Sequence, residues 1–354
     1  MDAVVVIDKP LAVTSFDVVA QVRRLMGERR IGHAGTLDPL ATGVLVLCLG
    51  ETTKLVPYLM DADKEYRATA RLGVATDTDD ADPRAQIVSR APEAALRQLD
   101  AATIQDVLAR MTGDVRQRPP RFSALKVDGQ RLYDKARLAR RQGPDPADAA
   151  EGEPGPDAVD MATADKTRTV RIDEIVVESL QLQQPTDGTA AAGWLPEVTF
   201  RVRCGKGTYI RSIARDLGDA LGVGAHLGAL RRLRVGRFDV AGAVSPSDVA
   251  RAPRHDLVSA LAHLPQLHVQ AAVAGRIRCG QPAVLTDLRP LLPAMPQPVA
   301  VIDPAGQLVA ILDAAGPPAQ PGIVPAHPRW QIARGFVPRP IDPPRRAAAA
   351  QGQE

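Results

Sequence analysis

IGHAGTLDPLATGVLVLCLG, residues 31–50, places a histidine, His33, and a single carboxylate, Asp38, among glycines just ahead of an apolar strand. Pro39 follows Asp38 directly. An isolated Asp–Pro pair is typical of a solvated turn, because both residues favour turn conformations. The stretch alone does not say whether Asp38 is such a turn residue or carries chemistry, and the rest of the sequence has to decide.

The length and composition are those of a globular protein. The 354 residues suffice for two domains, and 45% are hydrophobic and 24% charged. No apolar run approaches the roughly 20 residues of a membrane helix, and the first residues do not resemble a targeting segment. Cys48, Cys204 and Cys279 are too far apart for a zinc or disulfide pattern. We therefore expect a cytoplasmic protein without a membrane segment.

The net charge of +3 averages two opposed blocks. Between Arg110 and Arg141 ten Lys or Arg residues stand against three acids, whereas residues 143–165 contain seven acids and no Lys or Arg. A second basic segment, LRRLRVGR, spans residues 230–237. Basic blocks suit a polyanion partner, because each phosphate contact releases counterions. A solvated basic face explains the charge equally well, so charge alone does not identify a partner.

Hydrophobic periodicity predicts a mixed α+β fold. Strands are expected at residues 3–8, 44–49, 65–73 and 197–204. One helix is expected at 14–27, with Thr14 or Ser15 as its N-cap and Gly27 at its end. Two more helices are expected within 92–111, and another from Tyr209 to near Gly222.

Two later segments have a different composition. Residues 143–165 are rich in Pro, Ala, Gly and acids, which predicts a flexible insertion in a loop. Beyond about residue 265, the short apolar runs PVAVID, QLVAIL and WQIARGFV predict a small β-rich domain. The sequence is thus divided into a first domain at 1–250, a β-rich domain at 265–340 and a disordered tail at 341–354.

Two partial motifs fail on inspection. DTDDAD, residues 77–82, begins like a calcium loop but lacks the mid-loop glycine, and Val88 stands where a bidentate Glu is needed. CGKGTY, residues 204–209, lacks the spacing of a phosphate-binding loop. Since the six histidines also lack metal-ligand spacing, no metal site and no cofactor are predicted.

Several separate strings together resemble one family. They are VVIDKP, GHAGTLDPLATG, KEYRATARLG, RPPRFSALKVDGQRLYDKAR, CGKGTYIRSIARDLG and LGALRRLRVG. The assembly closely resembles the TruB family, the bacterial tRNA pseudouridine-55 synthases, from residue 4 to about 140 and from about 168 to 240. The C-terminal part is only faintly similar to the small RNA-binding domain of PUA type in that family.

The resemblance implies roles for three catalytic residues. Asp38 is implied to be the catalytic carboxylate, and Arg211 to pair with it and hold it ionised in a desolvated pocket. Tyr66 is implied to stack on the target base and to assist the final proton removal. The plainer alternatives are a helix-surface arginine for Arg211 and an aromatic residue of the core for Tyr66.

Four further residues are implied to bind the substrate. Tyr209 matches a pocket aromatic, and Leu230 matches a pocket wall, although an apolar residue there suits the core equally. His33 resembles the residue that fills the space left by the flipped nucleotide, or else is bonded within its own loop. Lys9 either supports the active-site loop, touches phosphate, or forms a surface ion pair.

The chemistry of pseudouridine formation fits these residue types. The reaction breaks the N-glycosidic bond of a uridine, turns the base and rejoins it through carbon, without a redox change. A carboxylate can act as the nucleophile, or can assist departure of the base and deprotonate the sugar. Glycines around Asp38 would let an RNA backbone approach closely.

We therefore expect a cofactor-independent isomerase for a uridine in the T-loop arm of tRNA, monomeric, with the base flipped out. The implied fold is a curved mixed, mainly antiparallel sheet flanked by helices, plus a β-rich PUA-like domain. Two features depart from the family: Phe122 replaces a common tyrosine, and the insertion at 143–165 has no counterpart. A tRNA-folding chaperone with dispensable catalysis and an N-glycoside hydrolase are the alternative functions.

Overall fold

The computed structural model describes residues 1–122, 126–127, 130–131, 167–182, 195–281, 284–288, 292, 298–314 and 330–336. The predicted insertion at 143–165 and the predicted tail at 341–354 lie outside these residues, as does most of the basic block from residue 123 to 141. None of the helices within the described ranges has the length and apolar character needed to cross a membrane.

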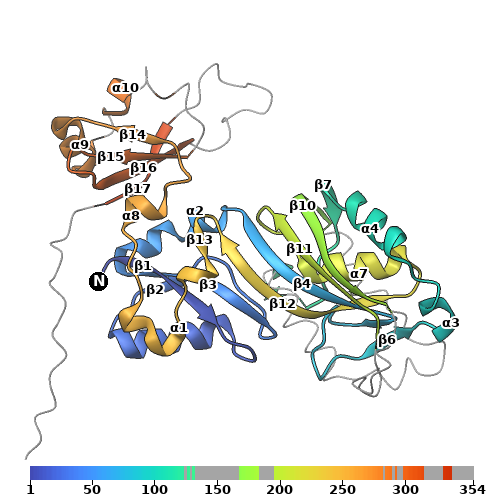
Figure 1. Ribbon diagram of the computed structural model, residues 1–354. Helices are drawn as coiled ribbons and strands as arrows, with labels where there is room; N and C mark the ends of the chain where they lie inside the picture. Colours follow the sequence, from blue (N-terminus) through green and yellow to red (C-terminus); the bar gives the residue numbers. More distant parts are fainter. Residues whose placement is uncertain are drawn as a thin grey trace, which may run out of the picture.

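A large curved sheet runs through the body of the molecule (Figure 1). Its strands follow the order β1-β3-β12-β4-β11-β10-β7, with β2 beside β3 and β13 beside β12. The strands are β1 (Ala3–Lys9), β2 (Ile31–His33), β3 (Ala41–Leu49), β4 (Lys64–Leu72), β7 (Gly113–Gln117), β10 (Arg168–Gln181), β11 (Glu197–Cys204), β12 (Ala225–Val235) and β13 (Phe238–Asp239). Only the pairing of β12 with β3 is parallel among these strands. The predicted mixed, mainly antiparallel sheet is therefore confirmed.

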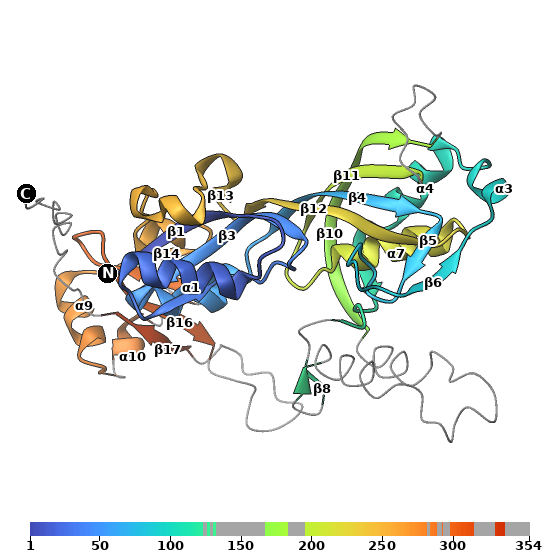
Figure 2. The ribbon, with the colours of Figure 1, turned by 90° about the horizontal axis from the view of Figure 1, so that it is seen from below.

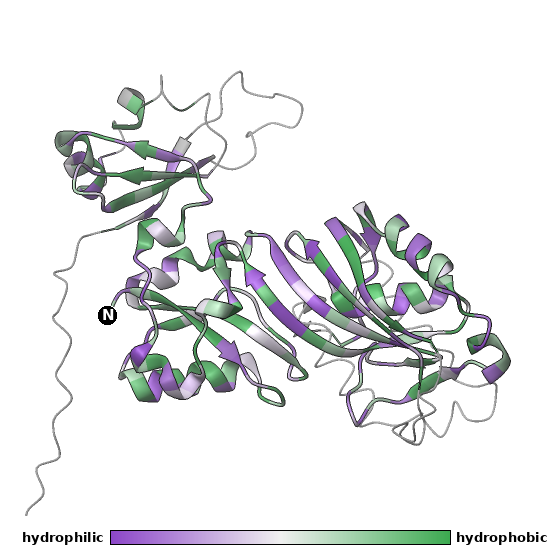
Figure 3. Ribbon diagram, viewed as in Figure 1, coloured by the Kyte–Doolittle hydropathy of each residue, from purple (hydrophilic) through white to green (hydrophobic). Residues whose placement is uncertain are grey.

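One end of this sheet is buried on both faces. Side chains alternate along β1 and β3, so that Val5 and Leu45 pack with helix α1 (Ser15–Met26) on one face. Val4 and Val46 point to the opposite face and join a second apolar cluster. This explains why β3 reads as a continuous apolar run, whereas β4 alternates between buried and exposed positions. Figure 3 shows the mixed hydropathy along β4.

Helix α1 begins and ends where its sequence predicts. Thr14 is the N-cap and forms a capping box with Asp17, since each side chain bonds to the backbone of the other residue. Gly27 ends the helix at φ 61, a left-handed conformation that glycine adopts without strain. The helix thereby places Ser15 beneath the loop that carries Asp38.

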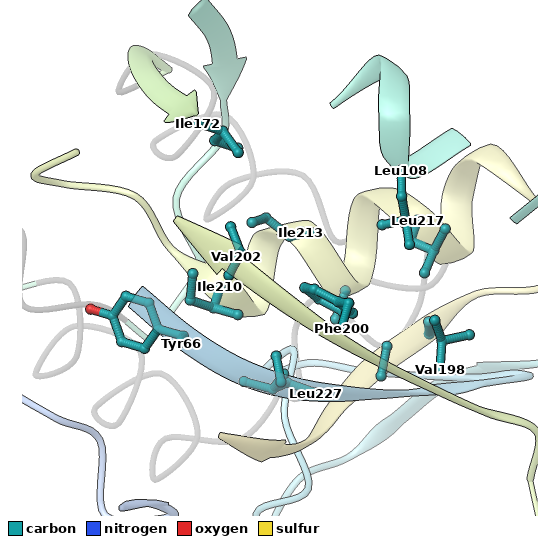
Figure 4. Close-up of a cluster of buried hydrophobic side chains, with 14 of the residues drawn as sticks. Tyr66, Leu108, Ile172, Val198, Phe200, Val202, Ile210, Ile213, Leu217 and Leu227 are labelled. Carbon is teal, nitrogen blue, oxygen red and sulfur yellow. The ribbon is translucent and has the colours of Figure 1, made fainter. Parts of the chain in front are cut away.

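The other end of the sheet carries helices on one face. Helix α7 (Ile210–Ala220) and helix α4 (Ala101–Arg110) pack Ile213, Leu217 and Leu108 against Phe200 and its neighbours on β11, as Figure 4 shows. The two helices predicted within 92–111 are confirmed as α3 (Glu93–Leu96) and α4. Smaller elements are η1 (Gly50–Leu55), α2 (Val56–Met60), β5 (Val74–Thr76), β6 (Ile87–Arg90), β8 (Lys126–Val127), β9 (Gln130–Arg131), η3 (Val240–Gly242), η4 (Pro246–Arg251) and α8 (Leu257–Ala260).

A second, four-stranded sheet forms the small β-rich unit that the sequence predicts near the C-terminus. Its elements are β14 (Gln266–His268), α9 (Ala271–Arg278), α10 (Val284–Leu288), β15 (Val299–Ile302), β16 (Leu308–Ala314) and β17 (Trp330–Gly335). The sheet lies beside β1 and α8 in both ribbon views (Figures 1 and 2). Ile302, Ile311 and Phe336 share a buried cluster with Val4 and Val46 of the body.

Candidate active site

Asp38 and Arg211 form an ion pair between the β2–β3 loop and the start of α7. Arg211 Nε lies 3.0 Å from Asp38 Oδ2, and the side chains are 6% and 40% exposed, respectively. The arginine also donates to the carbonyls of Thr78 at 3.0 Å and Phe122 at 2.9 Å. Burial alone would lower the pKa of Arg211, but the carboxylates of Asp38, Asp80 and Asp79 raise it, so the guanidinium stays charged. A buried, fixed cation thus holds a carboxylate that faces solvent.

Lys9 supports the loop of Asp38 from beneath. Its side chain is 0% exposed, and Nζ donates to the carbonyls of Pro10 at 2.8 Å, Val13 at 2.7 Å and Pro39 at 3.3 Å. Burial lowers the pKa of Lys9 to about 8, although the nearby Asp38 acts in the opposite direction. Of the three roles considered for Lys9, support of the loop fits this position. A phosphate contact and a surface ion pair do not, because no part of the side chain reaches solvent.

Arg232 holds the same loop from the side of the sheet. It is 1% exposed, and its guanidinium donates to the carbonyls of Val44 at 2.7 Å, Gly35 at 2.9 Å and Thr36 at 3.4 Å. Strand β12 approaches β3 closely at Gly43, where an added Cβ would lie 2.1 Å from Arg232 O. Ser15 Oγ completes the support, because it accepts from Leu37 N at 2.9 Å and donates to Leu37 O at 3.1 Å.

Most arginines of the basic segment 230–237 have partners within the fold. It forms most of β12, in the middle of the sheet. Arg231 pairs with Asp8 at 2.7 Å, and Arg234 pairs with Glu65 at 3.1 Å. Arg232 is buried as described, so the charges of these three arginines are used within the fold, whereas Arg237 is exposed and donates to Ser259 O. The three arginines in residues 231–234 thus serve strand pairing and loop support.

A cavity of about 810 Å³ opens over the ion pair. Five of the predicted site residues line it, and they come from separate parts of the chain: Asp38, Tyr66, Tyr209, Arg211 and Leu230. The two others, Lys9 and His33, do not line it. Leu230 is placed there by β12, since it lies opposite Ala41 of β3. The fold therefore brings together residues up to 192 positions apart in the sequence.

Tyr66 presents a buried aromatic ring to this cavity. It is 8% exposed and lies on β4 at the edge of the apolar cluster, with its hydroxyl pointing away from that cluster in Figure 4. Burial raises the pKa of Tyr66 above its usual value, although the Arg232 guanidinium acts in the opposite direction. The phenol is therefore protonated at neutral pH, which suits stacking and hydrogen-bond donation better than proton removal.

Tyr209 is fixed through its backbone and its ring. Gln117 of β7 accepts from Tyr209 N at 2.7 Å and donates to Tyr209 O at 3.0 Å, so that one amide side chain satisfies both backbone groups. Arg168 lies over the ring, with Cζ 5.0 Å from the ring centroid. Neither Gln117 nor Arg168 was singled out from the sequence, because each lies on a strand that was not predicted.

His33 is the last residue of strand β2, five positions before Asp38. Its Nδ1 is buried and bonds to no residue in the described ranges, so a histidine anchored through this atom within its loop is not observed. Burial and the nearby Arg232 lower the pKa of His33, which keeps the imidazole neutral at pH 7.

Two further carboxylates surround the arginines of α7. Asp80 Oδ2 lies 3.9 Å from Arg211, and Asp79 Oδ2 lies 3.0 Å from Arg215. Burial raises the pKa of Asp79 to about 6, although Arg215 and Arg211 act in the opposite direction. Both acids belong to the DTDDAD segment, which the sequence analysis set aside as an incomplete calcium loop. In the sequence, only the cluster of acidic residues in this segment could have indicated that Asp79 and Asp80 lie near the site. No group of His, Cys, Asp and Glu residues suited to a metal occurs within the described parts of the chain.

Comparisons with known proteins identify the family of this chain. Residues 23–146 match the N-terminal domain of the TruB family of pseudouridylate synthases, and residues 211–263 match the tRNA pseudouridylate synthase B C-terminal domain. The chain is 43% identical to the tRNA pseudouridine synthase B of Thermobifida fusca over 249 residues, which cover 70% of this chain and 74% of that protein. It is 39% identical to the protein of the same name from Mycobacterium leprae over 341 residues, 94% of each chain.

Solved structures share the fold at lower identity. The crystal structure of a Cbf5-Nop10-Gar1 complex contains a chain with a TM-score of 0.63 and 24% identity, covering 95% of this chain and 85% of that one. An H/ACA RNP bound to a substrate RNA containing 2′-deoxyuridine gives a TM-score of 0.60 at 23% identity, covering 95% and 86%. The α+β fold expected from the sequence is thereby confirmed. The chain therefore belongs to the TruB family of pseudouridylate synthases and is an isomerase.

Proposed function

We propose that this protein converts uridine 55 in the T-loop of tRNA to pseudouridine, with Asp38 as the catalytic carboxylate. The curated relatives at about 40% identity carry the name tRNA pseudouridine synthase B. The observation that carries the proposal is the Asp38–Arg211 ion pair at the wall of a cavity lined by two tyrosines.

The reaction requires one carboxylate and no change in redox state. The C1′–N1 bond of the uridine breaks, the base turns, and a C1′–C5 bond forms. C5 then loses its proton and N1 gains one, so substrate and product are isomers. Asp38 either attacks C1′ as a nucleophile or assists departure of the base and accepts a proton from the sugar. Both routes need an ionised carboxylate, which Arg211 stabilises because its own charge is fixed.

The remaining residues at and around the cavity can each be given a role in binding the uridine or in holding the loop of Asp38. A uridine stacked within a tRNA loop has to be flipped out before a side chain can reach C1′. Tyr66 and Tyr209 offer ring faces on which the flipped base can stack, and Leu230 supplies an apolar wall. Lys9 and Arg232 act through the loop, because they hold the backbone around Asp38. His33, neutral and outside the cavity, is left as the candidate for filling the space that the uridine vacates.

The domain boundaries follow from the same proposal. Residues 1–250 form the catalytic domain, and residues 265–340 form an RNA-binding domain that contacts tRNA beyond the T-arm. The shared cluster of Phe336 and Val4 fixes the second sheet against the first, so we expect one rigid binding surface. We further propose that the protein acts as a monomer.

Conversion of an unmodified T-arm hairpin tests the proposal. The hairpin is incubated with the protein and digested, and its nucleosides are separated. We expect one pseudouridine per hairpin from the wild-type protein. A hairpin with cytidine at the target position is the matched control and should give none. Absence of pseudouridine from the uridine hairpin, under conditions where the protein binds it, would contradict the proposed function.

A further inference from the structure

Arg168 is the first residue of β10 and lines the cavity that contains Asp38. It lies opposite Gln117 in the antiparallel pair of β10 and β7. The two residues hold Tyr209 together, because Gln117 bonds its backbone while the Arg168 guanidinium lies over its ring. Arg168 Nη2 also donates to Gly207 O. The guanidinium is thus held over the Tyr209 ring at the cavity wall.

The other basic residues that line the cavity are already occupied. Arg211 pairs with Asp38, and Lys206 pairs with Asp61 at 2.9 Å. Arg171 pairs with Asp173 at 3.2 Å and Asp114 at 3.6 Å. Lys64 and Arg232 donate to backbone carbonyls within the fold. Arg168, in contrast, has no carboxylate within 4.0 Å in the parts of the chain that the structure describes.

Most of the hydrogen-bonding capacity of Arg168 is also unused. A guanidinium has five N–H donors, and the carbonyl of Gly207 takes one of them. Nε is buried and has no partner among the described residues. Arg168 is partly exposed at the cavity, so its remaining N–H groups are available to a ligand that enters there. Its planar fork matches the oxygens of a phosphate better than an ammonium does.

We propose that Arg168 binds a backbone phosphate next to the uridine that enters the cavity, while it holds the Tyr209 ring against the base. The inference rests on the proposed function, since it takes RNA as the ligand. It adds a phosphate-binding residue that the Asp38–Arg211 chemistry does not require. The amide of Gln117 keeps the Tyr209 backbone in place when Arg168 is changed, so the fold should survive the substitution.

A salt titration of hairpin binding tests this role. Arg168→Gln should weaken binding about tenfold at low salt, as expected for a lost charged hydrogen bond. It should also reduce the slope of log Kd against log salt by about 0.7 to 0.9, the contribution of one phosphate contact. Arg168→Lys should keep most of the slope. Arg171→Gln is the matched control from the same strand and should leave the slope unchanged, because two acids already neutralise Arg171. A wild-type slope for Arg168→Gln would overturn the proposal.

An uncharged phosphate analogue gives a second, independent test. Methylphosphonate is placed in turn at the two phosphates that flank the target uridine. One of these hairpins should bind wild-type protein about tenfold more weakly, and Arg168→Gln should bind that hairpin no more weakly than the unmodified one. If neither substitution affects wild-type binding, the proposal is wrong even when Arg168→Gln fails to fold. Because the wild-type protein should form pseudouridine in either case, failure of this inference is distinct from failure of the proposed function.

Discussion

Arg211 is buried, and the Asp38 carboxylate that it holds at 3.0 Å is 40% exposed. The difference arises because the arginine is anchored on the protein side by the carbonyls of Thr78 and Phe122. Nε then presents one N–H to Oδ2, which leaves Oδ1 free of this contact. The pair therefore orients a carboxylate toward the cavity without covering it.

Replacing Arg211 with Lys should slow pseudouridine formation by about 100-fold or more. The charge remains, but an ammonium cannot bond Asp38 and two carbonyls in the plane of a guanidinium, and a misplacement of about 1 Å is enough for such a loss. The single-turnover rate with saturating enzyme is the measurement. Arg201→Lys is the control, since Arg201 is exposed and pairs with Glu178 at 2.8 Å. Equal rates for Arg211→Lys and wild type would show that the geometry of the pair is unimportant.

Gly43→Ala should destabilise the protein by about 2–5 kcal/mol, because the added Cβ would clash with the backbone of β12 and strain a left-handed residue. Gly43 has φ 101, and its Cβ would lie 2.1 Å from Arg232 O. Gly222→Ala is the control that measures the backbone strain without a clash, since Gly222 has φ 70 and no atom lies within 4 Å of the added Cβ. That variant should lose only about 1–2 kcal/mol. Urea unfolding compares the two, and equal losses would argue against close packing of β12 on β3.

The buried ammonium of Lys9 predicts a pH dependence of stability. Its pKa is lowered from 10.5 to about 8 in the folded protein. Between these values the unfolded chain holds a proton that the folded protein has released, so this group makes the free energy of unfolding rise with pH. Below pH 8 Lys9 is protonated in both the folded and the unfolded state, so it does not make the free energy of unfolding depend on pH.

Lys9→Met should remove that contribution. The free energy of unfolding, measured in urea at several pH values between 8 and 10, should rise less steeply in the variant than in the wild type. Lys206→Met is the control, because Lys206 is 68% exposed. If the Lys9→Met curve runs parallel to the wild-type curve, Lys9 is not the titrating group.

Local sequence patterns predicted much of the fold. The capping residues of α1, the alternation along β4 and the apolar run of β3 each act over a few neighbouring residues, so periodicity and caps reveal them. Strand β12 was not predicted, because its positions do not alternate between buried and exposed and its pairing with β4 contains two register shifts. Its place between β3 and β4 depends on pairings with residues more than 150 positions away.

The site residues also divide into those that local sequence motifs reveal and those that depend on long-range contacts. Asp38, Tyr66 and Arg211 were identified because long motif strings carry them. Arg232 was assigned to a basic surface, since nothing near it in sequence indicates that it bonds to Gly35, 197 positions away. Arg168 and Gln117 depend on the register of β10 with β7, and Asp79 and Asp80 on contacts with α7. Such long-range contacts are set by the fold, and one local segment does not encode them.

The most direct measurement is the single-turnover conversion of the T-arm hairpin by Asp38→Asn, made together with its binding affinity. Asparagine keeps the shape of the side chain and removes the charge that either catalytic route needs. The account predicts no detectable pseudouridine and a Kd within a few-fold of the wild-type value. Formation of pseudouridine at a rate near that of the wild type would contradict the central claim that the Asp38 carboxylate carries the chemistry.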